Sequence, residues 1–140
     1  MNDVLINKIP SLQRGIRRAR EVYQADPEGF ATNYMRQDAA LLNVLRACET
    51  TIDLVNYVVR TYKLGVPASS ADSFKLLRAG RVIGARMAER MQKMVGFRNT
   101  VIHQYTEVDI RIVEAVIVSE LDELLAFAER VREYVHNAAN

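Results

Sequence analysis

The amino-acid sequence predicts an all-α protein, a bundle of four long helices and one short helix. Apolar residues recur three and four positions apart over long stretches, which places them on one face of a helix. Short segments with glycine, proline or serine separate these stretches. No stretch shows the alternation of apolar and polar residues that is typical of a strand. Together these observations indicate helices that pack through apolar faces.

The first predicted helix covers residues 3–25. Its apolar face contains Leu5, Ile9, Leu12, Ile16, Ala19 and Tyr23. Pro10 removes a backbone donor inside this pattern, so we expect a kink there or a helix that starts near Lys8. The segment DPEG, residues 26–29, is predicted to form a turn.

The second predicted helix runs from about Thr32 to Tyr62, and about thirty residues of helix are about 45 Å long. Its apolar face contains Leu41, Leu45, Cys48, Ile52, Val55 and Val59. Because this length exceeds the core of a small bundle, we expect the helix to extend beyond its bundle or to pack against a second copy. Beyond it we expect Gly65 as C-cap, and Ser70 or Asp72 as the next N-cap.

A short helix is predicted over residues 73–79, and the fourth helix begins near residues 82–85. The fourth helix carries Met87, Met91, Met94, Val101 and Tyr105. The apolar faces that contain Leu41 and Met87 are the candidates for contact between two copies. Thr106 and Asp109 fit a capping box, so we expect the last helix to start near Glu107. Its apolar face contains Val113, Ile117, Leu121, Leu124, Ala128, Val131 and Val135.

The composition excludes several classes of protein. The net charge is only +2, which permits contact with nucleic acid but does not indicate it. Cys48 is the only cysteine, and no cluster of cysteine and histidine predicts a metal site. No signal peptide is recognisable, and no apolar segment approaches the ~18 residues of a membrane span. We therefore expect a soluble, cytoplasmic protein whose single domain spans residues 1–140.

Two groups of charged residues each have two interpretations. The first predicted helix carries arginines on one face, which form either a solvated surface, the favoured interpretation, or a phosphate-binding strip. These are Arg14, Arg17 and Arg18. The second group forms either an ion-pair ladder within its helix or a set that orients a site residue on a neighbouring helix. It consists of Arg46, Glu49 and Asp53.

The segment GFRNTVIHQY, residues 96–105, places Arg98, His103 and Tyr105 close together in a chain with only two histidines. On an ideal helix Arg98 and Tyr105 point within ~20° of each other, whereas His103 points about 140° away from Arg98. The three side chains therefore do not converge on one straight helix. Either a helix end near Tyr105 relaxes this geometry, or two facing copies bring residues of different chains together.

These side chains suit the cleavage of RNA by internal transfer. Histidine can act as acid or base near neutral pH, and arginine offers a permanently charged fork of donors to phosphate oxygens. RNA supplies its own nucleophile, the 2′-hydroxyl, so no metal or protein nucleophile is needed. A symmetric dimer would supply one histidine as base and a second as acid. The alternative is structural, because arginine and histidine also favour the C-terminal end of a helix.

The pattern Arg-x4-His-x-Tyr stands within MAERMQKMVGFRNTVIHQY and follows LGVPASSADSFKLLRAG and RQDAALLNVLRACETTID. In this context the chain resembles the HEPN superfamily, and more closely the HepT toxins of HEPN/MNT toxin–antitoxin systems. The resemblance covers nearly the whole chain and is weakest in the first and last helices. It implies a dimerising HEPN-type bundle that acts as a metal-independent endoribonuclease without a cofactor, with its active site at the dimer interface.

The resemblance also implies a role for each motif residue. Arg98 would bind the phosphate and the transition state, His103 would be the general acid and base, and Asn99 would support them. Tyr105 would accept AMP from a small nucleotidyltransferase, the MNT antitoxin, and the AMP would block RNA and neutralise Arg98. The expected partners are a second copy, this antitoxin and an RNA such as tRNA or mRNA. The alternative is a non-catalytic HEPN protein that binds substrate or nucleotide beside a nucleotidyltransferase.

Overall fold

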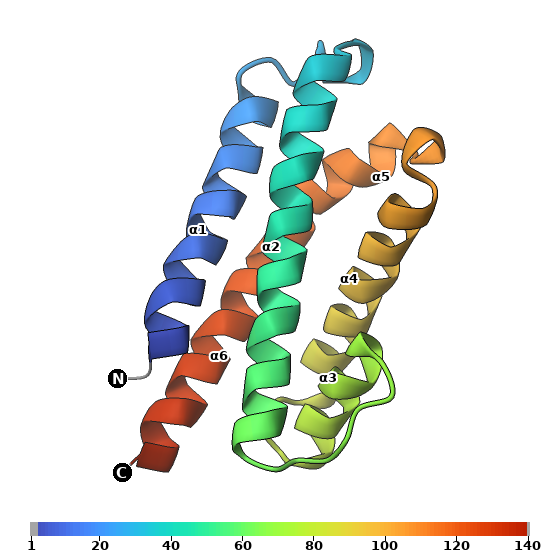
Figure 1. The fold of residues 1–140 in the computed structure, drawn as a ribbon. Helices are drawn as coiled ribbons and strands as arrows, with labels where there is room; N and C mark the ends of the chain where they lie inside the picture. Colours follow the sequence, from blue (N-terminus) through green and yellow to red (C-terminus); the bar gives the residue numbers. More distant parts are fainter. Residues whose placement is uncertain (1–2, 140) are drawn as a thin grey trace.

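The computed structural model of the protein describes residues 3–139, and all regular secondary structure in that range is helical. The long helices are α1 (Asp3–Gln24), α2 (Tyr34–Thr61), α4 (Ala85–His103) and α6 (Leu121–Ala139), with the shorter α3 (Ser70–Ala79) and α5 (Ile110–Ala115) (Figure 1). Short turns of helix are η1 (Phe30–Thr32), η2 (Tyr105–Glu107) and η3 (Val116–Glu120). The predicted all-α class is confirmed. Residues 1, 2 and 140 of the predicted domain lie outside the described residues.

The last predicted helix is present but contains a π-helical turn. α5, η3 and α6 follow one another without a gap, and η3 has the wider π-helical geometry. Arg20 of α1 donates through Nε to the carbonyl of Ile117 in η3 at 3.3 Å, and through its terminal nitrogen to Asp122 at 2.8 Å. A π-helical turn disturbs the regular hydrogen-bond ladder, and this arginine satisfies a carbonyl there. With the three segments taken together, the chain has the four long helices and one short helix that were predicted.

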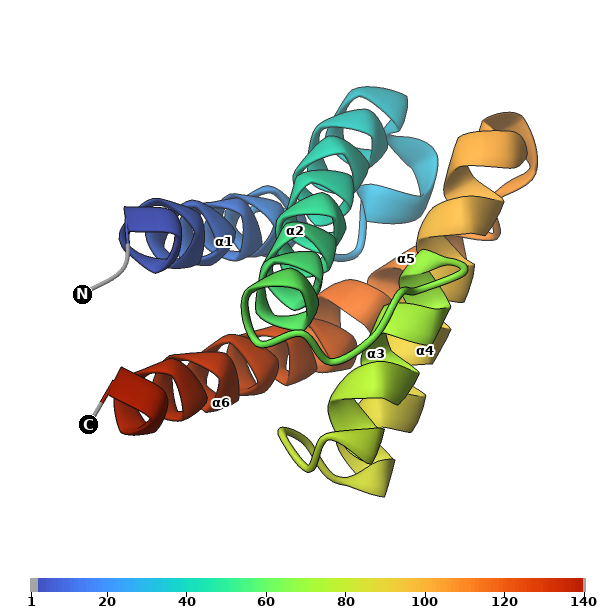
Figure 2. The same cartoon turned by 60° about the horizontal axis from the view of Figure 1, so that its bottom comes forward.

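α1 packs closely along α2 and holds one side of the core (Figures 1 and 2). A Cβ added at Gly15 of α1 would lie 3.4 Å from the carbonyl oxygen of Asn43 in α2, so glycine permits this close approach. The predicted apolar face is confirmed except at Tyr23, which is half-buried and donates to Glu114 at 3.3 Å. None of the helices in residues 3–139 has the length and apolar run needed to cross a membrane.

α1 begins at Asp3 and runs through Pro10, so the predicted start near Lys8 is wrong. Pro10 lies on the exposed side, while Leu5 and Ile9 on the opposite side are buried. A proline inside a helix costs about 3 kcal/mol, and each buried leucine or isoleucine contributes about 1.5–3 kcal/mol. Burial of the first two turns therefore offsets the loss of one backbone hydrogen bond.

The predicted caps around α3 are each displaced by one or two residues. α2 is closed by Lys63, not Gly65: Lys63 has a φ of 53°, and the Leu64 amide donates to the Val59 carbonyl at 3.0 Å. This is the Schellman motif, in which hydrogen bonds to carbonyls of the last helical turn offset the energetic cost of the left-handed conformation. The N-cap of α3 is Ser69, whose hydroxyl accepts from the Asp72 amide at 3.1 Å.

The predicted capping box at Thr106 is also wrong. The carboxylate of Asp109 itself accepts the Arg111 amide at 2.9 Å, so Asp109 is the N-cap and α5 starts at Ile110. A carboxylate is a strong acceptor for the unpaired amides in the first turn of a helix. Thr106 does not cap α5 and lies within η2. α4 ends at His103, two residues earlier than expected.

Most of the apolar face of α2 that contains Leu41 is buried within the chain, so little of it is left for contact with a second copy. Five of its six members are buried and Leu45 is half-buried: the buried ones are Leu41, Cys48, Ile52, Val55 and Val59. The helices α1, α3, α4 and α6 all contact α2. The length of α2 is therefore used inside one bundle. The predicted apolar face of α4 is less completely buried. Met91 and Val101 are buried, whereas Met87 and Met94 are half-buried.

Phe74 of α3 and Phe127 of α6 test this packing, because both are fully buried and their ring centroids lie 5.3 Å apart. We expect Phe74→Ala to lower the free energy of unfolding by about 3–5 kcal/mol in urea, at fixed protein concentration. Val66→Ala is the control, because Val66 is 93% exposed, and should change it by less than about 0.5 kcal/mol. A loss below about 1 kcal/mol for Phe74→Ala would contradict this position of α3.

Candidate functional site

Arg98 is held in place by α2. Its Nε donates to Oε1 of Glu49 at 2.6 Å, and one terminal nitrogen donates to Oδ1 of Asn99 at 2.8 Å. The Arg98 side chain is 22% exposed and that of Glu49 is 46% exposed, so the pair lies at the edge of the core. The hydrogen bond that Arg98 donates to Glu49 raises the pKa of Arg98, which therefore stays charged. The guanidinium has five N–H donors, and the bonds to Glu49 and Asn99 leave the remainder for a ligand.

Glu49 and its neighbour Asp53 settle the two interpretations of the charged group on α2. Glu49 bonds to Arg98 of α4, and Asp53 bonds to Lys8 of α1 at 2.9 Å. Both carboxylates thus reach neighbouring helices, and the ladder within α2 is wrong. The bond from Arg98 to Glu49 has the geometry that the other interpretation requires, in which an acid of this group contacts a candidate site residue on another helix.

Tyr105 lies just beyond α4, in η2, and returns to α2. Its hydroxyl donates to the carboxylate of Asp38, and this hydrogen bond, together with partial burial, raises the pKa of Tyr105. Asp38 was not singled out from the sequence. Asp38 and Glu49 are eleven positions apart, about three turns, so they share a face of α2. α4 runs in the direction opposite to α2 (Figure 1). The earlier carboxylate, Asp38, therefore contacts the later residue, Tyr105, and Glu49 contacts Arg98.

His103 is exposed and is the last residue of α4. The helix continues through His103, so its direction stays about 140° away from that of Arg98. The expectation that a helix end relaxes this angle is therefore wrong for His103, and only Tyr105 lies past the end. Within one chain, Arg98 faces α2 while His103 faces away from Arg98.

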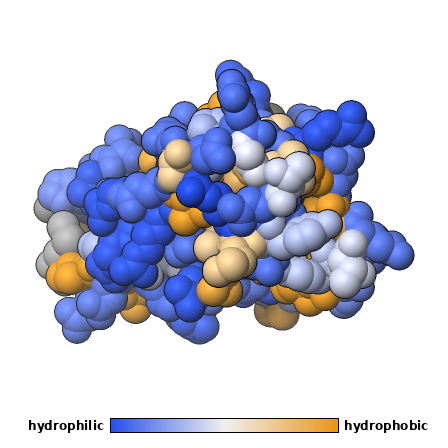
Figure 3. Space-filling model, turned by 90° about the horizontal axis from the view of Figure 1, so that it is seen from above, coloured by the Kyte–Doolittle hydropathy of each residue, from blue (hydrophilic) through white to orange (hydrophobic). Residues whose placement is uncertain are grey.

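A groove of about 430 Å³ lies beside the Arg98–Glu49 pair, between α1, α2 and α4. It is lined by Ser11, Leu42, Leu45, Arg46, Glu49, Thr50 and Ile102. Leu42 and Ile102 are exposed apolar residues on its walls. The end of the molecule where α4 stops is mostly hydrophilic, with apolar residues in separate spots (Figure 3). The groove thus combines an apolar surface with a charged rim near the motif.

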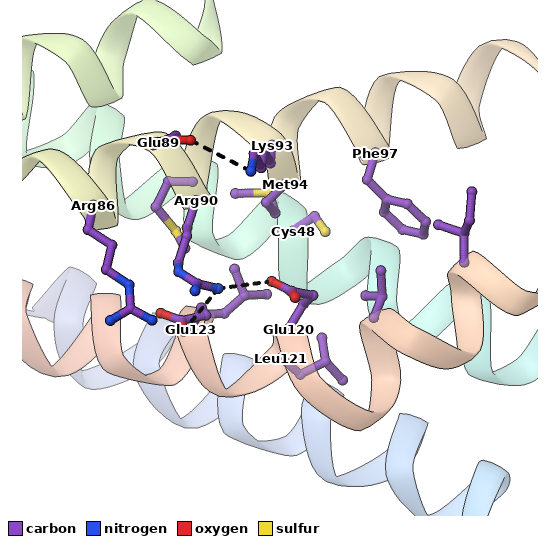
Figure 4. A pocket seen from close by; sticks show the side chains of 14 residues that line it. Cys48, Arg86, Glu89, Arg90, Lys93, Met94, Phe97, Glu120, Leu121 and Glu123 are labelled. Atoms are coloured by element: carbon purple, nitrogen blue, oxygen red, sulfur yellow. Dashed lines mark ion pairs between the residues drawn. The ribbon is translucent and has the colours of Figure 1, made fainter.

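A second cavity of about 430 Å³ lies between α4 and the α5–η3–α6 segment (Figure 4). Several of its charged residues form ion pairs: Arg90 lies 3.4 Å from Glu123, and Lys93 lies 3.6 Å from Glu89. Cys48 is part of its wall, and burial raises the pKa of this thiol to about 12, with a smaller contribution from Glu49. The thiol is therefore neutral and poorly nucleophilic at neutral pH. None of the motif residues lines this cavity.

The remaining sequence candidates lie apart from the motif. Arg14, Arg17 and Arg18 are all exposed on α1, as both interpretations of that face require. Among residues 3–139, no three histidine, cysteine, aspartate or glutamate side chains gather as a metal ion would require.

Comparisons with known proteins agree with this fold and show the family of the chain. A model of the ribonuclease HepT-like family matches residues 12–131. The chain is 38% identical over 132 residues to the mRNA nuclease HepT of Shewanella oneidensis, covering 94% of this chain and 98% of that protein. It is 28% identical over 126 residues to a putative RNase of Archaeoglobus fulgidus, covering 90% and 89% of the two chains.

Solved structures show the same similarity in three dimensions. The tri-AMPylated HEPN toxin of Shewanella oneidensis, in complex with MNT antitoxin, matches with a TM-score of 0.89 and 38% identity, covering 95% of this chain and 99% of that chain. A toxin–antitoxin complex with AMP-PNP matches with a TM-score of 0.88 and 37% identity, covering 94% and 99%. The chain belongs to the ribonuclease HepT-like family of HEPN proteins.

Proposed function

We propose that the protein is the toxin of a HEPN/MNT toxin–antitoxin system, a metal-independent endoribonuclease in which Arg98 and His103 are catalytic. The observation that carries this proposal is the fixed orientation of Arg98 by Glu49 and Asn99 on a helix that ends in an exposed histidine. Membership of a ribonuclease family supports it, as does the similarity to an mRNA nuclease. We also propose that residues 1–140 form a single domain and that the protein acts in the cytoplasm, where RNA is available as a substrate.

In the proposed reaction the RNA 2′-hydroxyl attacks the adjacent phosphorus. A bond forms from the 2′-oxygen to phosphorus, and the bond from phosphorus to the 5′-oxygen breaks. One histidine takes the 2′-proton, and a second gives a proton to the leaving 5′-oxygen. Arg98 donates to the phosphate oxygens, where negative charge grows in the transition state, and Asn99 helps to hold its guanidinium.

We propose that the working form is a homodimer, because one chain supplies one motif histidine. The angle between Arg98 and His103 on an unbroken helix supports this, since facing copies would let His103 meet Arg98 of the other copy. Leu42 of α2 and Ile102 of α4 are exposed apolar residues that offer a surface for the contact. Leu42 and Ile102 line the groove beside the Arg98–Glu49 pair.

We propose that AMP attached to Tyr105 by an MNT nucleotidyltransferase neutralises the toxin. Tyr105 is 48% exposed, so its side chain lies at the surface, within reach of a partner protein. The added phosphate carries negative charge, and the nucleoside adds bulk at the end of α4 next to the catalytic residues. RNA is then excluded both by occupancy and by competition for Arg98. The similar Shewanella oneidensis toxin, AMPylated in its complex with MNT antitoxin, supports this role.

His103→Ala should abolish RNA cleavage, with a loss of at least about 10²-fold, because proton transfer by a positioned side chain contributes this much. The measurement is the rate of cleavage of a labelled RNA by purified proteins, with the fold checked by circular dichroism. His136→Ala is a matched control, since His136 is the other histidine and is exposed near the end of α6. Cleavage by His103→Ala at the wild-type rate would contradict a catalytic role for His103, and absence of cleavage by the wild-type protein would favour a binding module.

Glu49→Ala should lower kcat for RNA cleavage by roughly tenfold, because Arg98 loses the contact that orients it. RNA affinity should hold or increase, because a negative charge beside the cleft is removed. Asp53→Ala is the matched control: it removes a carboxylate of α2 that bonds to Lys8 of α1, away from the motif. If kcat responds equally to the two substitutions, Glu49 has no specific role in positioning Arg98.

Tyr105→Phe should leave RNA cleavage within about threefold of wild type while removing neutralisation by the nucleotidyltransferase. The phenyl ring keeps the packing of Tyr105 but has no oxygen to accept AMP. Growth after co-expression with the antitoxin, together with the intact mass of the purified toxin, measures this. Full neutralisation of Tyr105→Phe would place the modified group elsewhere.

A further inference from the structure

The contact between Tyr105 and Asp38 joins two segments that are far apart in the sequence. Tyr105 begins η2, which is held to the end of α4 because the Glu107 amide donates to Gln104 at 2.9 Å and the Gln104 amide donates to Thr100 at 2.8 Å. Asp38 lies in the second turn of α2, with its side chain exposed. The tyrosine hydroxyl donates to the Asp38 carboxylate, so a defined turn and a rigid helix both fix the hydroxyl group.

This contact fixes the direction of the phenolic proton. The O–H bond points at the carboxylate of Asp38, so the lone pairs of the oxygen point to other sides. Tyr105 as a whole is 48% exposed, so a reagent can approach its side chain from solvent. A phenol that attacks phosphorus must present a lone pair to the phosphorus and lose its proton. The hydrogen bond to Asp38 gives the proton an acceptor and directs the lone pairs of the oxygen away from that carboxylate.

We propose that Asp38 orients the Tyr105 hydroxyl and accepts its proton while AMP is transferred to that oxygen. This rests on the proposed neutralisation by AMP. In the step, the Tyr105 oxygen forms a bond to the α-phosphorus of ATP, and the bond from that phosphorus to the bridging oxygen breaks. Pyrophosphate leaves with the electron pair, and the phenolic proton moves to the carboxylate of Asp38.

The timing of the proton transfer follows from the acidities of the two groups. The hydrogen bond to Asp38 raises the pKa of Tyr105, so free phenolate is scarce at neutral pH. A carboxylate does not remove the proton in advance, since an ordinary phenol is several pK units less acidic than a carboxylic acid. As the oxygen bonds to phosphorus, its proton becomes far more acidic and passes to Asp38. Asp38 thus acts as a general base during bond formation.

The test compares Asp38→Asn and Asp38→Glu with wild type in the initial rate of AMP transfer from ATP. The cognate MNT nucleotidyltransferase is used at saturating concentration, and mass spectrometry measures the adduct. Asp38→Asn keeps an oxygen that accepts from the hydroxyl but cannot hold the proton, so we expect a loss of roughly 10²-fold. Its residual rate should rise with pH through the alkaline range, as phenolate forms, more steeply than that of wild type. Asp38→Glu should restore part of the rate.

Two controls separate this role from other effects. RNA cleavage without antitoxin should stay within about twofold for both Asp38 variants, since Asp38 contacts Tyr105 and not Arg98. Glu107→Gln removes an exposed carboxylate from the same turn and should leave transfer unchanged. AMP transfer to Asp38→Asn at the wild-type rate and pH profile would overturn the inference alone. A wild-type chain that accepts no AMP would contradict the proposed neutralisation, and the inference with it.

Discussion

The ion pair between Arg98 and Glu49 is the interaction on which the candidate site depends. A partly exposed pair of this kind contributes at most about 1 kcal/mol to folding, so its importance lies in orientation. It fixes the guanidinium against α2, and Asn99 fixes a second edge. Asp38 does the same for Tyr105 three turns away along α2. The buried face of α2 builds the core, while its Glu49 and Asp38 position Arg98 and Tyr105.

The sequence predicts the helices well because each long helix has a continuous apolar face that the core requires. The sequence also predicts the motif, because Arg98, His103 and Tyr105 lie within eight consecutive residues. Glu49 could be identified as a candidate from the sequence, because it lies three and four positions from Arg46 and Asp53 on one helix face. Asp38 could not be found in this way, because its partner lies 67 positions away and nothing local marks it. The caps failed for a related reason: Lys63 takes a left-handed conformation usually left to glycine, because the end of α2 requires it there.

Features that packing within one chain does not explain gather around the motif. Gly96 lies inside α4, where glycine costs about 0.5–1 kcal/mol relative to alanine, yet a Cβ there would meet nothing within 4 Å. Leu42 and Ile102 leave apolar surface exposed next to the charged rim of the groove. His103 points away from Arg98. A facing copy would account for all of these, since it would approach the open backbone, cover the apolar side chains and bring histidine to arginine.

The central claim is that His103 from each of two copies, together with an oriented Arg98, promotes attack of the RNA 2′-hydroxyl on the adjacent phosphorus. The most direct measurement is the chemistry of the cut ends, determined on a defined RNA in excess EDTA. Internal transfer predicts a 2′,3′-cyclic phosphate on one fragment and a 5′-hydroxyl on the other, at an undiminished rate. Fragments with a 3′-hydroxyl and a 5′-phosphate, or cleavage that stops in EDTA, would contradict it, because water activated by a metal would then be the nucleophile.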